Sequence, residues 1–171
     1  MGDRPTQEAL VRQWCDIIAD PALRELPYKI ELNARGKIEM SPASNLHGYL
    51  QSLVATELKR LLPDGLVITE ASVLTAIGVR VPDVVWASHA FVTAHGLVTP
   101  FPRAPEICVE VLSPTNTREE IDEKIAAYLA AGAIEVWVVA EDGRTCYYDA
   151  TGERATSRFG VTPILPVPGG S

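Results

Sequence analysis

The order of apolar and polar positions divides the chain into amphipathic helices and short strands. Residues 6–19 and residues 44–62 each place apolar side chains near one helical face, and the second stripe is broad. Residues 28–40 instead alternate in two segments around a four-residue connection, which is the pattern of a β-hairpin. The first part of the chain therefore predicts a helix, a hairpin and a longer helix, in that order.

The rest of the chain predicts strands with one further helix among them. Residues 117–132 repeat apolar residues at helical spacing, with a capping box from Thr117 to Glu120 at the start and Gly132 as the stop. The strand-like segments are residues 66–78, 79–87, 106–113 and 134–140. The last of them is almost wholly apolar, as in a strand covered on both faces. This pattern predicts a single α/β unit.

Two parts of the chain lack a strong period. Residues 88–105 hold three prolines, and we expect them to form a long loop beside the site or a lid over it. Residues 146–149 and 154–159 predict a closing hairpin, and the proline-rich tail is expected to be extended. We expect one domain over residues 1–171. Its parts are an N-terminal helical extension (1–26), a core (27–160) and an extended tail (161–171).

Composition places the chain among ordinary globular proteins. Its 171 residues are enough for one domain with a substantial core, and they are 47% hydrophobic and 22% charged. No stretch is long and apolar enough to span a membrane, and the N-terminus lacks the order of a signal peptide, so we expect a cytoplasmic protein. The three cysteines show no CxxC spacing and are expected to be reduced.

The net charge limits the ways in which the protein could bind nucleic acid. The formal charge is −7, whereas a protein that binds DNA without sequence preference usually has a basic surface. This balance argues against strong nonspecific binding. It leaves open a local basic groove.

Asp83 and Glu110 are acids set among apolar residues in two predicted strands. A carboxylate in such a place costs on the order of several kcal/mol unless a metal, a cation or hydrogen bonds compensate it. Lys124 borders the apolar side of the following helix, three residues after Ile121 and four before Tyr128. These three residues are the first candidates for chemistry.

Each candidate also has a structural explanation. Asp83 could cap a turn or pair with an arginine. Pro82 before it makes the strand irregular or places it at an edge, which can aim the Asp83 side chain. Glu110 could form a buried ion pair, and Lys124 could extend to the surface and pair with Glu120.

Two auxiliary residues are weaker candidates. His47 lies near the start of the second long helix, where most histidines are structural, and Glu70 at the end of a strand could be an extra metal ligand or an exposed acid. His89 and His95 have no zinc-site spacing to a cysteine, so we discount zinc.

Three segments of the chain resemble the Uma-type endonucleases of bacteria. In order, they are PD at residues 82–83, EVLSPTN from Glu110 and DEKIAAYLAAGAIEVWVV from Asp122. This family lies in the PD-(D/E)xK restriction-endonuclease-like superfamily. The resemblance implies a core of helix, three strands, helix and strand. It also implies that Asp83 and Glu110 are magnesium ligands and that His47 is the histidine often found in the first core helix.

The sequence departs from the superfamily pattern at one position. A lysine is expected two residues after the acid, where this chain has Leu112, and Lys124 on the following helix is the natural substitute. Two carboxylates and a backbone carbonyl near Val111 would suit Mg²⁺, or Mn²⁺ in its place. The expected reaction is hydrolysis of phosphodiester bonds in nucleic acid, most simply DNA, with phosphate contacts from Arg80, Arg103 and Arg118.

Two alternative functions remain. The acidic charge and the missing strand lysine favour a non-catalytic scaffold or protein-interaction module that keeps the nuclease fold. An enzyme that hydrolyses another phosphate ester with the same metal is the third possibility. Trp14, the N-terminal helix and the apolar tail also predict a homodimer.

Overall fold

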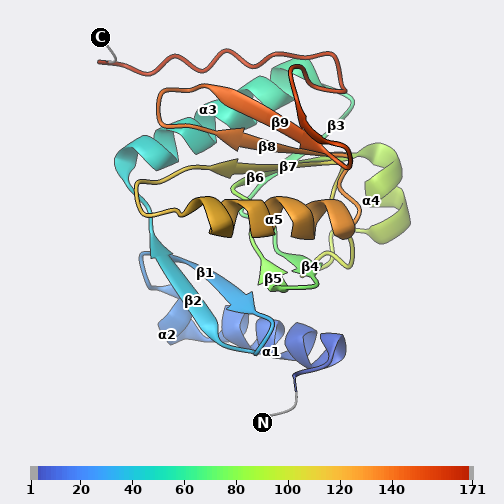
Figure 1. Ribbon diagram of the computed structural model, residues 1–171. Helices are drawn as coiled ribbons and strands as arrows, with labels where there is room; N and C mark the ends of the chain where they lie inside the picture. Colours follow the sequence, from blue (N-terminus) through green and yellow to red (C-terminus); the bar gives the residue numbers. More distant parts are fainter. Residues whose placement is uncertain (1–3, 170–171) are drawn as a thin grey trace.

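The computed structural model describes residues 4–169, which form two sheets and five helices (Figure 1). The helices are α1 (Gln7–Ala19), α2 (Pro21–Arg24), α3 (Asn45–Leu61), α4 (His89–His95) and α5 (Arg118–Ala130). The strands are β1 (Tyr28–Asn33), β2 (Ile38–Pro42), β3 (Gly65–Thr69), β4 (Val73–Thr75), β5 (Gly78–Arg80), β6 (Val84–Ser88), β7 (Ile107–Val111), β8 (Glu135–Val139), β9 (Thr145–Asp149) and β10 (Gly152–Arg154).

The central sheet has six strands in the order β10-β9-β8-β7-β6-β3. Strand β6 pairs antiparallel with both β3 and β7, whereas β8 runs parallel to β7 after the crossover through α5. In chain order the core elements are α3, β3, β6, β7, α5 and β8. This is the predicted α/β core of helix, three strands, helix and strand.

Helices cover both faces of the six-stranded sheet (Figure 1). On one face, the stripe of α3 packs on alternate sheet residues, and this cluster includes Leu50, Val54, Leu58, Val109 and Trp137. On the other face, α5 packs on the intervening residues, and that cluster includes Cys108, Ile121, Ile125, Tyr128 and Val136. Strand alternation therefore places Glu110 on the α5 face, together with Cys108.

The second sheet joins the N-terminal hairpin to the core in the order β2-β1-β5-β4. Gly78 has φ +116° where β5 meets β1, and a Cβ there would lie 2.0 Å from the carbonyl oxygen of Leu32. Only glycine permits this approach. The hairpin is thereby held beside the strand that leads to Asp83.

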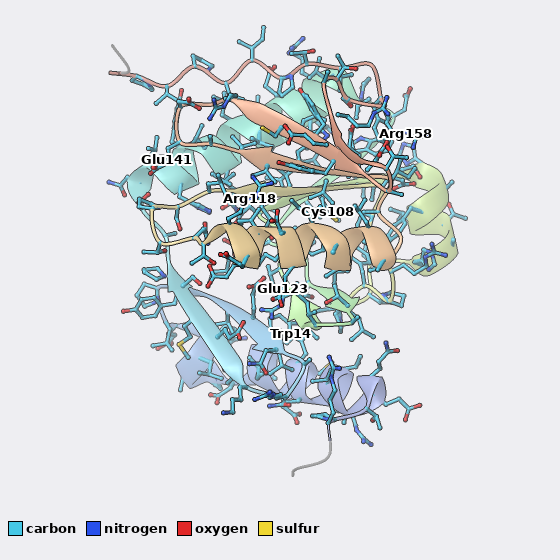
Figure 2. All side chains as sticks on the ribbon, viewed as in Figure 1. Trp14, Cys108, Arg118, Glu123, Glu141 and Arg158 are labelled. Atoms are coloured by element: carbon cyan, nitrogen blue, oxygen red, sulfur yellow. The ribbon has the colours of Figure 1, made fainter. Side chains whose placement is uncertain are left out.

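Helix α1 covers this smaller sheet through its own core cluster. Leu10, Trp14 and Ile17 pack with Leu32 and Val79, and Trp14 lies between helix and sheet (Figure 2). Trp14 is only 5% exposed, so its apolar surface is already buried within the chain. One of the reasons for expecting a dimer is therefore weaker, and the dimer stays a prediction.

The expectation of a loop over residues 88–105 is partly wrong, because its first part is α4. The hydroxyl oxygen of Ser88 accepts a hydrogen bond from the backbone N–H of Phe91, and Gly96, with φ +68°, follows the last helical residue. Phe91 packs into the α5-side core, so these local caps and one buried ring specify a helix too short for a clear period.

The closing hairpin is tighter than predicted, since its second strand is β10 at residues 152–154 rather than residues 154–159. The carboxylate of Asp149 accepts hydrogen bonds from the backbone N–H and hydroxyl of Thr151, at 2.8 and 2.6 Å. This side-chain turn starts the return strand early.

The C-terminal tail has no regular structure and lies against α3, as Figure 1 shows. Glu57 of α3 accepts hydrogen bonds from Arg60 and from the backbone N–H of Ile164, the latter at 2.8 Å. Leu165 is buried in the α3-side cluster. Within residues 4–169, no helix has the length and apolar character needed to cross a membrane.

Glu57→Gln should lower the free energy of unfolding at pH 7 by about 1–2 kcal/mol, since it weakens hydrogen bonds to a charged acceptor. Arg60 and the Ile164 N–H lower the pKa of Glu57 from 4.5 to about 2. The stabilisation is therefore complete above pH 4.5 and is lost as the pH falls towards 2. Urea unfolding of both proteins across this range measures it, with Glu141→Gln, an exposed acid, as the control. A difference that stays constant with pH would contradict this account.

Candidate active site

Asp83 lies in the irregular connection between β5 and β6. Its backbone N–H donates to the Val109 carbonyl at 2.9 Å, and its carbonyl accepts from the N–H of Glu70 at 3.0 Å. The side chain is 1% exposed, and Oδ2 accepts a 2.7 Å hydrogen bond from the N–H of Val111. Pro82 supplies no N–H, so the strand is interrupted here, as expected, and the carboxylate turns towards the end of β7.

Glu110 points from β7 towards α5 and is 4% exposed. The hydroxyl of Tyr128 donates to its Oε1 at 2.6 Å, and Nζ of Lys124 lies 3.3 Å from both carboxylate oxygens. Helix α5 therefore supplies two donors, one full turn apart, to the same buried acid.

The two acids line one cavity of about 290 Å³, as expected from their matching strand positions. The same cavity is lined by all the other sequence candidates for the site, namely His47, Glu70, Val111 and Lys124. The chain thus brings the candidates together at the meeting point of the two sheets and the start of α3.

Lys29 of β1 is a cation of this site that sequence reasoning missed. Its Nζ lies 2.8 Å from Oδ1 of Asp83 and 3.9 Å from Oε2 of Glu110, and its side chain is 13% exposed. The ammonium therefore bridges the two carboxylates. It compensates the negative charge that burial would otherwise make costly.

Lys124 does not extend to solvent or pair with Glu120. It contacts Glu110, and its Nζ lies 3.1 Å from Glu31 of β1. We expected its ammonium to reach Asp83 as well, but the ammonium on Asp83 is that of Lys29. Lys29 thus contacts both carboxylates, whereas Lys124 contacts only Glu110 of the two.

Glu31 is a second residue that sequence reasoning missed. One carboxylate oxygen accepts from the N–H of Val81 at 2.8 Å, and the other lies 3.4 Å from Arg80. Arg80 is buried and also pairs with Glu39, so its guanidinium is engaged within the chain, and a phosphate contact by Arg80 stays a prediction. It is a structural partner of the hairpin.

His47 lies in the first turn of α3, with Nε2 at 3.3 Å from Oδ2 of Asp83. The nearby Asp83 carboxylate raises the pKa of His47. Nδ1 of the ring is buried and has no hydrogen-bond partner within the described part of the chain. Among the described residues, the imidazole ring is therefore held through Nε2 alone, by its contact with Asp83.

The pKa values of the two acids are shifted in opposite directions. Burial raises the pKa of Asp83, but Lys29 and His47 outweigh burial and bring it well below its usual range. Burial also raises the pKa of Glu110, and there the neighbouring lysines do not fully offset it. Burial lowers the pKa of Lys29, but Glu110 and Asp83 outweigh it and keep the ammonium charged. Such divergence between adjacent acids is typical of functional sites.

The donor set suits a hard divalent cation, although no ready-made cage exists. Within residues 4–169, no group of three or more His, Cys, Asp or Glu side chains is arranged to hold a metal ion. Mg²⁺, however, commonly uses one or two carboxylates and keeps several waters. Asp83 and Glu110 provide those oxygens, and the ammonium of Lys29 stands between them as a cation. A metal would therefore have to displace it.

The fold and the paired acids define a class, the α/β proteins with a restriction-endonuclease-like core. The chain belongs to the Uma2 family, described as "Putative restriction endonuclease", whose pattern matches residues 13–166.

A solved structure supports the fold. It is described as "a putative nuclease belonging to DUF820 from Anabaena variabilis", and it matches with a TM-score of 0.62 at 17% identity. The match covers 73% of this chain and 80% of that one. A comparison with curated proteins gives no match.

Signals for the missed residues were present in the sequence. Lys29 and Glu31 alternate with apolar residues in a strand, so both side chains lie on one face. Tyr128 follows Lys124 by four residues on α5 and was assigned to the apolar stripe, where its ring packs while its hydroxyl binds Glu110. What no pattern could show is that β1 lies beside the core strands.

Lys29→Met should lower the free energy of unfolding by about 3 kcal/mol in the presence of a chelator, because it leaves a buried carboxylate without its cation. Adding Asp83→Asn to this variant should recover part of the loss, since the uncompensated charge is then gone. Chemical denaturation measures both. Lys37→Met, an exposed lysine of the same hairpin, is the control, and an equal loss in that variant would contradict the assigned role.

Proposed function

We propose that the protein is a metal-dependent endonuclease that hydrolyses phosphodiester bonds of nucleic acid, with DNA as the first substrate to test. The observation that carries this proposal is the convergence of Asp83, Glu110 and Lys124 on one cavity. Family membership supports nuclease chemistry. Acids on opposite faces of the sheet would have argued against it.

Asp83 and Glu110 would hold Mg²⁺ or Mn²⁺, with the backbone carbonyl of Val111 as a third oxygen and Glu70 as an auxiliary acid at the cavity wall. When bound, the metal would polarise the phosphate and lower the pKa of a coordinated water. Asp83 is suited to this role because its pKa is low and its carboxylate stays ionised. His47 would keep that carboxylate oriented through the contact at Oδ2.

Lys124 would stabilise negative charge as it develops on the phosphate. Its side chain is 16% exposed, and its ammonium is held by Glu110 and Glu31 inside the cavity, where an ionic contact is stronger than in water. Tyr128 supports this arrangement, because its hydrogen bond to Glu110 fixes the acid against which Lys124 is held.

The orientation of Lys124 also bears on the scaffold alternative. A buried Glu110 needs a compensating cation in either kind of protein, but we expected a scaffold to turn Lys124 to solvent. Its contacts with two acids inside the cavity favour the enzyme. Cleavage of both strands of a DNA duplex would need two active sites, which a homodimer would supply. The homodimer therefore remains part of the proposal.

Asp83→Asn and Lys124→Ala should each reduce cleavage of single- or double-stranded DNA in Mg²⁺ by about 10²–10³-fold. Lys124→Ala should keep the fold, because a helix accepts alanine well and because the Tyr128 hydroxyl and Lys29 still contact Glu110. Lys124→Arg should restore activity only in part, since a planar guanidinium does not replace a compact ammonium. Gel assays with labelled oligonucleotides measure all three.

The matched control for this series is Lys59→Ala, an exposed lysine on α3 that should cut like the parent. A Lys124→Ala protein that cuts as fast as the parent would refute the role of this lysine. If the parent protein cuts neither DNA nor RNA with Mg²⁺ or Mn²⁺, the result would favour the non-catalytic scaffold over the enzyme.

Lys29→Met should bind Mn²⁺ roughly tenfold more tightly than the parent, because the ammonium no longer competes for the space between the acids. Asp83→Asn should abolish most of the binding in either background. Titration followed by electron paramagnetic resonance reads free Mn²⁺ directly and needs no turnover. Weaker binding by Lys29→Met, with Lys37→Met unchanged, would show that Lys29 supports the metal site instead of occupying it.

A further inference from the structure

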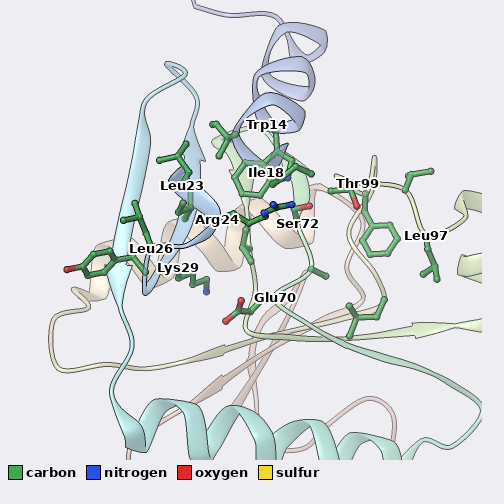
Figure 3. Close-up of a pocket in the computed structure, with 18 residues that line it drawn as sticks. Trp14, Ile18, Leu23, Arg24, Leu26, Lys29, Glu70, Ser72, Leu97 and Thr99 are labelled. Carbon is green, nitrogen blue, oxygen red and sulfur yellow. The ribbon is translucent and has the colours of Figure 1, made fainter. Parts of the chain in front are cut away.

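A second and larger cavity opens beside the candidate active site. It has a volume of about 590 Å³ and lies between helices α1 and α2, strand β1 and the segments around Ser72 and Thr99 (Figure 3). This volume falls within the range of about 300–1,000 Å³ in which ligand pockets occur. The proposed hydrolysis makes no use of it.

The wall of this cavity is mainly apolar, and its mouth stays open to solvent. Leu97, Val98 and Ile18 line it while remaining 61%, 50% and 40% exposed. Large apolar side chains left this open usually mark a binding surface. A few polar groups, those of Arg24, Ser72 and Thr99, lie among them (Figure 3).

The two cavities are neighbours that share part of their walls. Leu26, Tyr28, Lys29 and Glu70 line both of them. Figure 3 draws Lys29 and Glu70 at the wall of the larger cavity, and Lys29 also contacts Asp83. The larger cavity therefore lies directly beside the site proposed for the phosphate.

Glu70 is held at the junction in an unusual backbone conformation. It has φ +52°, which is uncommon for a residue other than glycine, and its N–H is tied to the carbonyl of Asp83 at 3.0 Å. Such conformations persist where the surrounding structure requires them, and they gather at binding sites. The contact links the wall of the large cavity directly to the main candidate metal ligand.

We propose that the larger cavity binds an unpaired nucleobase of the nucleic-acid substrate, next to the phosphodiester that is cleaved. A base has flat apolar faces and a polar edge, which matches an apolar wall with a few polar groups. A base is also covalently tied to a phosphate within a few ångströms, which matches two cavities that share walls. This inference rests on the proposed function and narrows the substrate to single strands or to duplexes with a displaced base.

The proposal predicts that binding depends on the bases and not only on the backbone. In Ca²⁺, chosen to limit cleavage, the protein should bind a mixed-sequence single-stranded oligonucleotide about tenfold more tightly than an abasic sugar-phosphate oligomer of equal length. Both ligands carry the same phosphates, so the ratio of their dissociation constants removes the backbone contribution. Fluorescence anisotropy measures it.

Two variants test whether the cavity is the source of that ratio. Ala71→Met fills the cavity from a buried position and should bring the ratio close to one. Leu97→Ala removes an exposed wall residue, cannot disturb the core, and should reduce the ratio several-fold. Ile164→Ala, which is 68% exposed on the tail and absent from the cavity lining, should leave the ratio unchanged.

The outcomes separate this inference from the function on which it rests. If the parent cuts nucleic acid but binds both ligands equally, or if both cavity variants keep the parent ratio, the base site is refuted while the nuclease stands. If the parent neither binds nor cuts any oligonucleotide, both fail. If the variants keep the parent binding ratio but change the molecular mass measured by analytical ultracentrifugation, the cavity is an interface between copies of the chain. That result would also refute a base site.

Discussion

The burial of Asp83 is the constraint on which the rest of the site depends. A carboxylate that is 1% exposed is tolerated only with strong compensation, and here it comes from Lys29, from the N–H of Val111 and from His47. These three partners belong to β1, β7 and α3. The same acid therefore ties the N-terminal hairpin, the central sheet and the first core helix to a single point.

This arrangement makes the smaller sheet part of the site. The hairpin supplies Lys29 and Glu31, and its pairing with β5 holds both beside the core acids. Helix α1 buries Trp14 and Ile17 against the same sheet and so fixes its position. The N-terminal segment acts as a structural wall for the cavities as well as a covering layer.

Periodicity was enough to predict the core elements, because strand alternation and the stripes of α3 and α5 are strong local signals. It also pointed to Asp83, Glu110 and Lys124, since charges among apolar residues stand out. It failed for α4, where caps around Ser88 and Gly96 outweigh a weak period, and for β10, where Asp149 closes the turn early. Lys29 was missed because its role depends on a contact with Asp83, 54 residues away in the chain, and no local pattern encodes that contact.

The capping box of α5 has a consequence for chain length. Thr117 and Glu120 bond to each other's backbone and fix where the helix begins, and Lys124 follows on the second turn. Each residue turns a helix by about 100°, so one residue inserted or deleted between the cap and Lys124 would swing the ammonium away from Glu110. Sequences that keep this lysine on the helix must therefore keep its spacing from the cap, whereas Leu112, directly after β7, packs against the apolar core.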